Sequence, residues 1–208
     1  MKILALELST GRGTIAWHVE GAEPFEVAFA NDRKHSGLFF ENLQQLLHRF
    51  GTPELITVGL GPGSYAGTRI AIATATGLQA TTGARLVGIS SLRALETDSD
   101  EYCVIGDARR QSFFFAHVAR RECIQGPQLH TRDELIARLA ASSHPVFASE
   151  KIAGVADNVL TAFPSARILA EIAARGGTPV TPMPLEPIYL RDPHITQPKG
   201  TPMPKLER

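Results

Sequence analysis

Short apolar runs and longer amphipathic stretches alternate along the chain, and this pattern predicts a mixed α/β protein. Apolar runs bounded by turn residues are typical of strands, whereas apolar residues at every third or fourth position are typical of helices. The first part of the chain predicts the order strand, strand, strand, helix, strand, helix, strand, helix. The corresponding ranges are 2–8, 14–19, 25–30, 36–50, 55–60, 65–81, 85–89 and 90–95.

A similar order begins again after the acidic stretch ETDSDE at residues 96–101, which we interpret as a linker. Thr131 and Glu134 form the sequence pattern of a capping box, so a helix is expected to begin there. A last helix is expected from Ser165 to Arg175, before two glycines. The strands predicted in this second part are 102–106, 112–119 and 145–148.

The two parts correspond in detail, which favours an internal duplication. Glu7 and Asp107 each follow an apolar strand, and an arginine-containing turn comes after each of them. Two lobes of the order βββαβαβα in tandem are the plan of the actin, Hsp70 and sugar-kinase folds, a ribonuclease H-like duplication. We therefore expect a two-lobed α/β fold, with an N-terminal lobe at 1–98 and a reduced second lobe with an extended tail at 99–208.

The stretch GPGSYAGTRIAIATATGL at residues 61–78 joins a strand, a glycine turn and a helix, and no charged residue lies between Arg69 and Arg85. Three interpretations compete for it. The turn could hold a phosphate at the helix N-terminus, although it lacks both the Walker spacing and GxGxxG. It could be a tight turn before a core helix. We prefer the third interpretation, a partner surface, because small residues let a second helix approach closely.

This stretch resembles the motif GPGSFTGxRIGxxxAxGL of the TsaB (YeaZ) family. Three further segments resemble family motifs in the same order along the chain. KILALELST resembles ILAIDTAT, IGDARRQSFFF resembles IDARxGEVY, and EPIYLRDPHIT resembles EPxYLR. The resemblance covers nearly the whole chain. It implies a non-catalytic subunit of the bacterial machinery that makes threonylcarbamoyladenosine in tRNA, and it agrees with the expected fold.

The resemblance also implies partners. We expect a TsaD-like catalytic subunit, with a TsaE-like ATPase as a further partner and tRNA reached through the complex. The chain would support threonylcarbamoyl transfer to adenosine 37 of tRNAs that read codons beginning with A. Because its partner surface would be uncovered when the chain is alone, we also expect the free protein to form a homodimer through that surface. ATP or ADP and a metal are expected in the complex or on the partner, and none is expected to bind strongly to this chain by itself.

The resemblance implies that the two helices at 36–50 and 65–81 meet equivalent helices of the partner. Both carry more apolar surface than one core face needs. Ala73 and Thr76 lie one turn apart beyond Arg69, where they offer a low ridge for a neighbouring helix. The interface residues that we expect are His35, Ser36, Phe39, Leu43, Gly61, Gly63, Ser64, Tyr65, Arg69, Ala73 and Thr76.

The residues that active members of this fold use for chemistry are present only in part. Glu7 stands where the TsaB family has Asp, and the second turn, DARRQ with Asp107 and Arg109, contains no glycine for close approach of a phosphate. We interpret Glu7, Asp107 and Arg109 as vestigial cofactor-binding positions and expect no catalytic residue. An ATP-binding phosphotransferase or ATPase of the same fold, the alternative function, would need two working phosphate turns.

Other functional classes receive little support. A glycoprotease-like peptidase would need a serine in GxSxG, whereas Ser64 stands in GPGSY. The seven histidines contain no HxxxH pair, so no metal site is expected, and His18 and His117 are interpreted as structural. Cys103 in a strand and Cys123 in a loop are expected to be unpaired thiols.

Charge and length limit the partners and the location. The chain has 208 residues and a formal net charge of zero, so no strong basic field would attract tRNA directly. Hydrophobic residues make up 43% of the chain, which is ample for a core. No apolar run reaches the length of a membrane span, and the opening residues lack the pattern of a signal peptide. A cytoplasmic location is expected.

Overall fold

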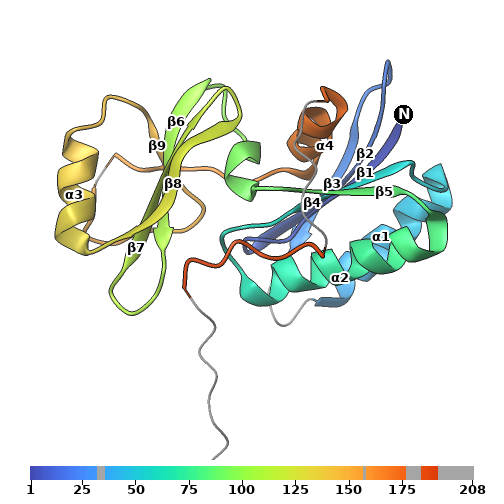
Figure 1. Cartoon of the computed structure of the whole chain (residues 1–208), viewed down its shortest axis with the longest axis horizontal. Coiled ribbons are helices and arrows are strands. Elements are labelled where there is room, and N and C mark those ends of the chain that lie inside the picture. Colours follow the sequence, from blue (N-terminus) through green and yellow to red (C-terminus); the bar gives the residue numbers. More distant parts are fainter. Residues whose placement is uncertain (32–35, 157, 177–183, 192–208) are drawn as a thin grey trace, which may run out of the picture.

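The computed structural model describes residues 1–31, 36–156, 158–176 and 184–191. Within these residues the chain forms two five-stranded sheets (Figure 1). The first sheet has the order β3-β2-β1-β4-β5; β1 pairs with β2 antiparallel and with β4 parallel. Its strands are β1 (Lys2–Glu7), β2 (Arg12–Val19), β3 (Phe25–Ala30), β4 (Leu55–Gly59) and β5 (Arg85–Ile89).

Helices cover both faces of the first sheet (Figure 1). The helices α1 (Ser36–Phe50) and α2 (Tyr65–Thr82) pack on one face, and α4 (Ala166–Ala174) packs on the other. Successive residues of a strand point to opposite faces, so Leu4 and Leu6 pack toward α1 and α2 while Ile3 and Ala5 pack toward α4. This double coverage explains why β1 is an almost uninterrupted apolar run.

The second sheet repeats the plan of the first. Its order, β10-β9-β6-β7-β8, matches that of the first sheet when β6 is equated with β1. The register agrees as well, because Ile3 lies opposite His18 and Cys103 lies opposite His117. The predicted two-lobed duplication is therefore confirmed. The elements are β6 (Glu101–Asp107), β7 (Phe113–Ala119), β8 (Glu122–His130), α3 (Arg132–Ala140), β9 (Val146–Ala148) and β10 (Leu160–Thr161).

Two strands of the second sheet are absent from the sequence prediction. Cys123 lies in β8 and not in a loop. β8 contains Gly126 and Pro127, which typically interrupt strands, but it is an edge strand, where a missing N–H costs little. β10 has only two residues, too few for any periodic pattern. Cys103 and Cys123 are unpaired thiols, as expected, and burial raises the pKa of both.

The last helix is placed differently from the expectation. It falls within the range 99–208 assigned to the second lobe, yet α4 packs against β1, β2 and β4 of the first sheet. Its buried residues Ile168, Leu169 and Ile172 cover the apolar face that Ile3 and Ala5 present. The free energy gained by burying this apolar face of the first sheet outweighs the closeness of α4 to the second lobe along the chain. The boundary near residue 98 itself stays a prediction.

Polar contacts hold the chain where it passes between the lobes. A short 3-10 helix, η1 (Ser91–Ala94), leads out of the first sheet. Arg12 forms a two-pronged ion pair with Glu96, and the guanidinium of Arg121 donates to the carbonyls of Leu95 and Thr97. None of the helices in the described part of the chain combines the length and the apolar character needed to cross a membrane.

Candidate functional site: a buried carboxylate and an exposed helix face

The carboxyl group of Glu7 lies at the end of β1 and is fully buried. The N–H of Ser9 donates to its Oε1 at 2.6 Å, and the hydroxyl of Ser91 donates to its Oε2 at 2.6 Å. Burial raises the pKa of Glu7, and the hydrogen bonds from Ser9 and Ser91 offset only part of that rise. Both carboxyl oxygens therefore have partners within the protein.

The glycine loop after β4 packs against this carboxyl group and against the turn that follows β1. A Cβ on Gly63 would lie 2.1 Å from the carbonyl oxygen of Ser9, so only glycine fits there. The N–H of Gly61 donates to Ser91 Oγ at 3.0 Å, and the N–H of Ser64 donates to the carbonyl of Ser9 at 2.6 Å. The loop thus joins β1, β4 and the segment after β5.

The N-terminus of α2 is capped by the protein itself. Ser64 precedes the helix in an extended conformation, and its hydroxyl accepts a hydrogen bond from the N–H of Gly67 at 3.2 Å. In phosphate-binding loops, N–H groups at this place point at the anion. Here Gly61, Ser64 and Gly67 each direct the N–H to a partner in the chain, which favours packing over phosphate binding as the role of the loop.

The second turn, between β6 and β7, has a different structure. Arg109, Arg110 and Gln111 adopt positive φ angles of 65°, 53° and 59°, a conformation that favours glycine. The N–H of Arg109 donates to Asp107 Oδ1 at 2.6 Å, and its guanidinium pairs with the same carboxylate. Asp107 and Arg109, two of the three predicted vestigial residues, are thus paired with each other.

The helices α1 and α2 both pack on the same face of the first sheet, and we call their exposed sides together the α1/α2 face (Figure 1). The side chain of Phe40 on α1 is 53% exposed, although it is large and apolar. Tyr65 and Ile70 on α2 are exposed as well. The remaining exposed residues of α2 are Ala66, Arg69, Ala73, Thr76, Gly77, Ala80 and Thr81.

The structure divides the predicted interface residues into several groups. Tyr65, Arg69, Ala73 and Thr76 lie on the α1/α2 face. Phe39 and Leu43 are buried in the core with the first sheet, so their placement at an interface is wrong. Residues three or four apart lie on the same side of a helix, so Phe39 and Leu43 both face the sheet. The adjacent Phe40 lies on the other side of α1 and is exposed.

The other predicted interface residues are grouped around the loop. Gly61 is buried, Gly63 is exposed, and Ser64 is half-buried as the cap of α2. Ser36 is the first residue of α1. His35 lies outside the described residues, as does the tail from Pro193 to Arg208.

The segment 184–191 crosses from one lobe to the other beside α2 (Figure 1). Leu185 is buried in the core beneath α1 and α2, and the N–H of Ile188 donates to the carbonyl of Leu60 at 2.8 Å. Leu190 packs instead with the core of the second lobe. The ring of Tyr189 lies 5.6 Å from that of Tyr65, so Tyr189 extends the α1/α2 face. The EPIYLR motif at residues 186–191 is the sequence signal that could have indicated that this segment packs against both lobes.

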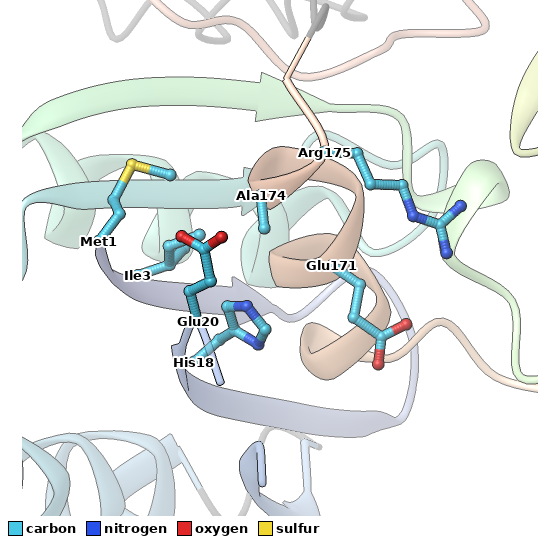
Figure 2. A pocket seen from close by; sticks show the side chains of 7 residues that line it. All are labelled: Met1, Ile3, His18, Glu20, Glu171, Ala174 and Arg175. Carbon is cyan, nitrogen blue, oxygen red and sulfur yellow. The ribbon is translucent and has the colours of Figure 1, made fainter. Parts of the chain in front are cut away.

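Two hollows lie elsewhere on the described part of the chain. One of about 450 Å³ is lined by Gln111, Thr131, Arg132 and Asp133. The other, of about 300 Å³, opens between the N-terminus, the end of β2 and α4 (Figure 2). Its lining residues are Met1, Ile3, His18, Glu20, Glu171, Ala174 and Arg175. Glu7, Asp107 and Arg109 line neither hollow, although Gln111 of the same turn as Arg109 lines the first.

Comparison with protein families identifies the relatives of this chain. The model of the family described as TsaD: tRNA N6-adenosine threonylcarbamoyltransferase matches residues 27–167, more than half of the chain. The chain belongs to this family. A search of curated proteins finds no match.

Solved structures confirm the fold. A Pseudomonas aeruginosa protein described as uncharacterized, with similarity to peptidase YEAZ, superimposes with a TM-score of 0.71 and 22% identity, over 91% of this chain and 99% of that one. YeaZ from Pseudomonas aeruginosa gives a TM-score of 0.66 and 18% identity, over 84% of this chain and 92% of its own. The resemblance to TsaB (YeaZ) stated from the motifs is confirmed in fold and extent.

Proposed function

We propose that this chain is a TsaB-type accessory subunit that binds a TsaD-like enzyme through the α1/α2 face. In that complex it supports threonylcarbamoyl transfer to adenosine 37 of tRNAs that read codons beginning with A. The observation that carries the proposal is the α1/α2 face itself, where apolar and small side chains remain exposed on two helices that cover the same face of the first sheet. Membership of the threonylcarbamoyltransferase family supplies the reaction in which the subunit takes part.

The α1/α2 face has the features of a helix-packing surface. Ala66, Ala73 and Ala80 are spaced at two turns along α2, so a partner helix can approach its backbone closely. Phe40 on α1 and Ile70 on α2 are large apolar groups that remain exposed, the kind of residue that anchors an interface when it is desolvated. The guanidinium of Arg69 lies over the ring of Tyr65 at 5.1 Å and adds a polar rim.

The hydrogen bonds of Glu7 and the pairing of Asp107 favour an accessory role over phosphoryl transfer. A carboxylate that holds magnesium or a reacting water needs an oxygen that faces the ligand. Both oxygens of Glu7 are occupied by Ser9 and Ser91, and Asp107 is paired with Arg109. A net charge of zero further favours contact with tRNA through the assembled complex.

A charge placed on the ridge tests the proposal. Ala73→Glu adds a carboxylate that would be desolvated and unpaired at a helix interface. It should weaken association with the TsaD-like protein by more than about a hundredfold, equivalent to about 3 kcal/mol. Ala137→Glu, at an exposed position of α3 in the other lobe, is the matched control and should bind as the wild type does. Binding is measured by titration with purified proteins.

Two outcomes of this titration decide the question. If Ala73→Glu and Ala137→Glu bind equally well, the α1/α2 face is not the interface. If the wild type itself fails to bind the TsaD-like protein, the accessory role is wrong. Circular dichroism of both variants checks that each is folded.

A further inference from the structure

A cluster of one carboxylate and two imidazoles lies in the second lobe, outside the surface described above. Glu101 begins β6, His117 lies in β7, and His144 lies in the loop that leads into β9. One ligand atom from each residue lies within 4.8 Å of the other two. His117 Nε2 is 2.9 Å from Glu101 Oε1, and His144 Nε2 is 3.4 Å from the same oxygen.

The sheet itself brings these residues together. β6 runs between β7 and β9, and Cys103 lies opposite both His117 and Val146. Glu101 is two residues before Cys103 and therefore shares its face of the sheet. The ladder between β7 and β8 is irregular on both sides of His117, and such irregularities often redirect side chains.

The rings are arranged to point at one place. The imidazoles of His117 and His144 are stacked, with centroids 4.9 Å apart and planes 27° from parallel. Both Nε2 atoms thereby approach the same oxygen of Glu101. His117 Nε2 is buried and makes no hydrogen bond among the described residues, although that oxygen is close to it. The contact with Glu101 is therefore the polar contact that this buried nitrogen makes among the described residues.

We propose that Glu101, His117 and His144 form a binding site for a divalent transition-metal ion of the Zn²⁺ class. Such an ion lies about 2.0–2.1 Å from its nitrogen and oxygen ligands. Ligands at right angles are then about 2.9 Å apart, and tetrahedral ligands about 3.4 Å apart. The two separations between imidazole and carboxylate in this cluster, 2.9 Å and 3.4 Å, are short enough for one ion to bind all three atoms, as they are for an ion pair without metal.

The ligand types define the class of ion. Imidazole nitrogens favour zinc, copper, iron and nickel, whereas calcium and magnesium favour sites made of oxygen. Three protein ligands leave at least one coordination position for water. The side chains of His117, His144 and Glu101 are 20%, 34% and 46% exposed, so an ion can reach the cluster from solvent.

Neighbouring groups hold the ligands in place. The N–H of His144 donates to Ser142 Oγ at 3.3 Å, and the same hydroxyl contacts Cys103 Sγ at 3.4 Å. The N–H of Cys103 donates to the carbonyl of Pro145 at 2.9 Å, which ties the loop of His144 to β6. These main-chain contacts fix the backbone that carries His144 beside β6.

Metal titration of the full-length chain without an affinity tag tests the site. After dialysis against a chelator, calorimetry with Zn²⁺ should show one ion per chain, and Co²⁺ should give the visible absorption of a low-coordinate site. His117→Ala and His144→Ala should each weaken Zn²⁺ binding by at least roughly tenfold. His48→Ala removes an exposed histidine from α1 and should leave binding unchanged.

Certain outcomes of these titrations would contradict the proposed metal site. Equal Zn²⁺ affinity in the wild type, His117→Ala and His144→Ala would exclude it, as would an equal loss in His48→Ala. If His117→Ala does not fold, Glu101→Gln at the exposed start of β6 replaces it, and unchanged affinity in that variant would exclude the site too. Binding to the TsaD-like protein is measured in parallel, because the changes at Glu101, His117 and His144 lie in the other lobe and should leave it intact.

Discussion

The Oε2 atom of Glu7 fills the space in which a side chain at position 59 would lie, because a Cβ on Gly59 would be only 1.8 Å from it. Gly59 is therefore required by contact with a buried carboxyl group, not by its backbone conformation. Gly59→Ala should lower the free energy of unfolding by at least about 1–3 kcal/mol, the usual cost of overpacking. Urea unfolding of the purified chain measures this change.

A double-mutant cycle shows whether Glu7 is the cause. In a Glu7→Ala background the obstructing carboxyl group is gone, so Gly59→Ala should cost clearly less than it does in the wild type. Equal costs in the two backgrounds would mean that another contact excludes the methyl group.

The buried carboxyl group of Glu7 should also make stability depend on pH. Its pKa is raised in the folded state by burial, so its neutral form is the one that folding favours. The contribution of Glu7 to the free energy of unfolding is fully present below the ordinary glutamate pKa of about 4.3. It is lost as pH rises through the raised pKa of the folded state. The wild type should therefore lose stability relative to Glu7→Gln as pH rises above about 4.

Thermal unfolding of the wild type and Glu7→Gln over this pH range measures the difference. Glu150→Gln, at an exposed position, should follow the wild type at every pH. A difference between Glu7→Gln and the wild type that does not change with pH would show that Glu7 has its ordinary pKa.

The α1/α2 face should join two copies of the chain when the partner is absent. Exposed apolar groups such as Phe40 and Ile70 favour a second covering surface, and a twofold axis lets one face pair with itself. We expect sedimentation of the wild type as a dimer that Ala73→Glu shifts toward monomer. A dimer that survives in Ala73→Glu would have to use another surface.

The segment after the last helix should contribute to stability through Leu185. This side chain is buried in the core beneath α1 and α2, so Leu185→Ala should cost about 2–4 kcal/mol. Leu160→Ala, whose side chain is 52% exposed in β10, should change stability by under about 0.5 kcal/mol. Similar losses in the two variants would show that the segment 184–191 does not anchor the first lobe.

Elements with a strong periodic pattern were predictable from the sequence, and those stabilised by distant contacts were not. The helix at 36–50 and the strand at 85–89 have the predicted bounds because their apolar spacing and end signals agree. β8 escaped prediction because pairing along β7 outweighs the local preferences of Gly126 and Pro127. The residues of α4 and those next to it in the chain do not indicate which sheet, or which face of it, the helix packs on.

Functional residues show the same division. The exposure of Ala73 follows from helical spacing around Arg69, and the structure agrees. Phe39 and Phe40 are adjacent aromatic residues, and which of them faces the sheet depends on how α1 docks. Glu101, His117 and His144 share no sequence motif, because β6, β7 and the loop before β9 bring them to one place.

The return of α4 to the first sheet also constrains how the protein is made. Strands β1 to β5 are synthesised early, yet the face carrying Ile3 and Ala5 stays bare until residues 166–174 leave the ribosome. The second sheet lies between these two parts of the chain, like a domain inserted into another. The first lobe therefore cannot complete its core ahead of the second, although N-terminal domains usually fold first during synthesis. A nascent chain that stops after β10 would expose this apolar face to chaperones and proteases.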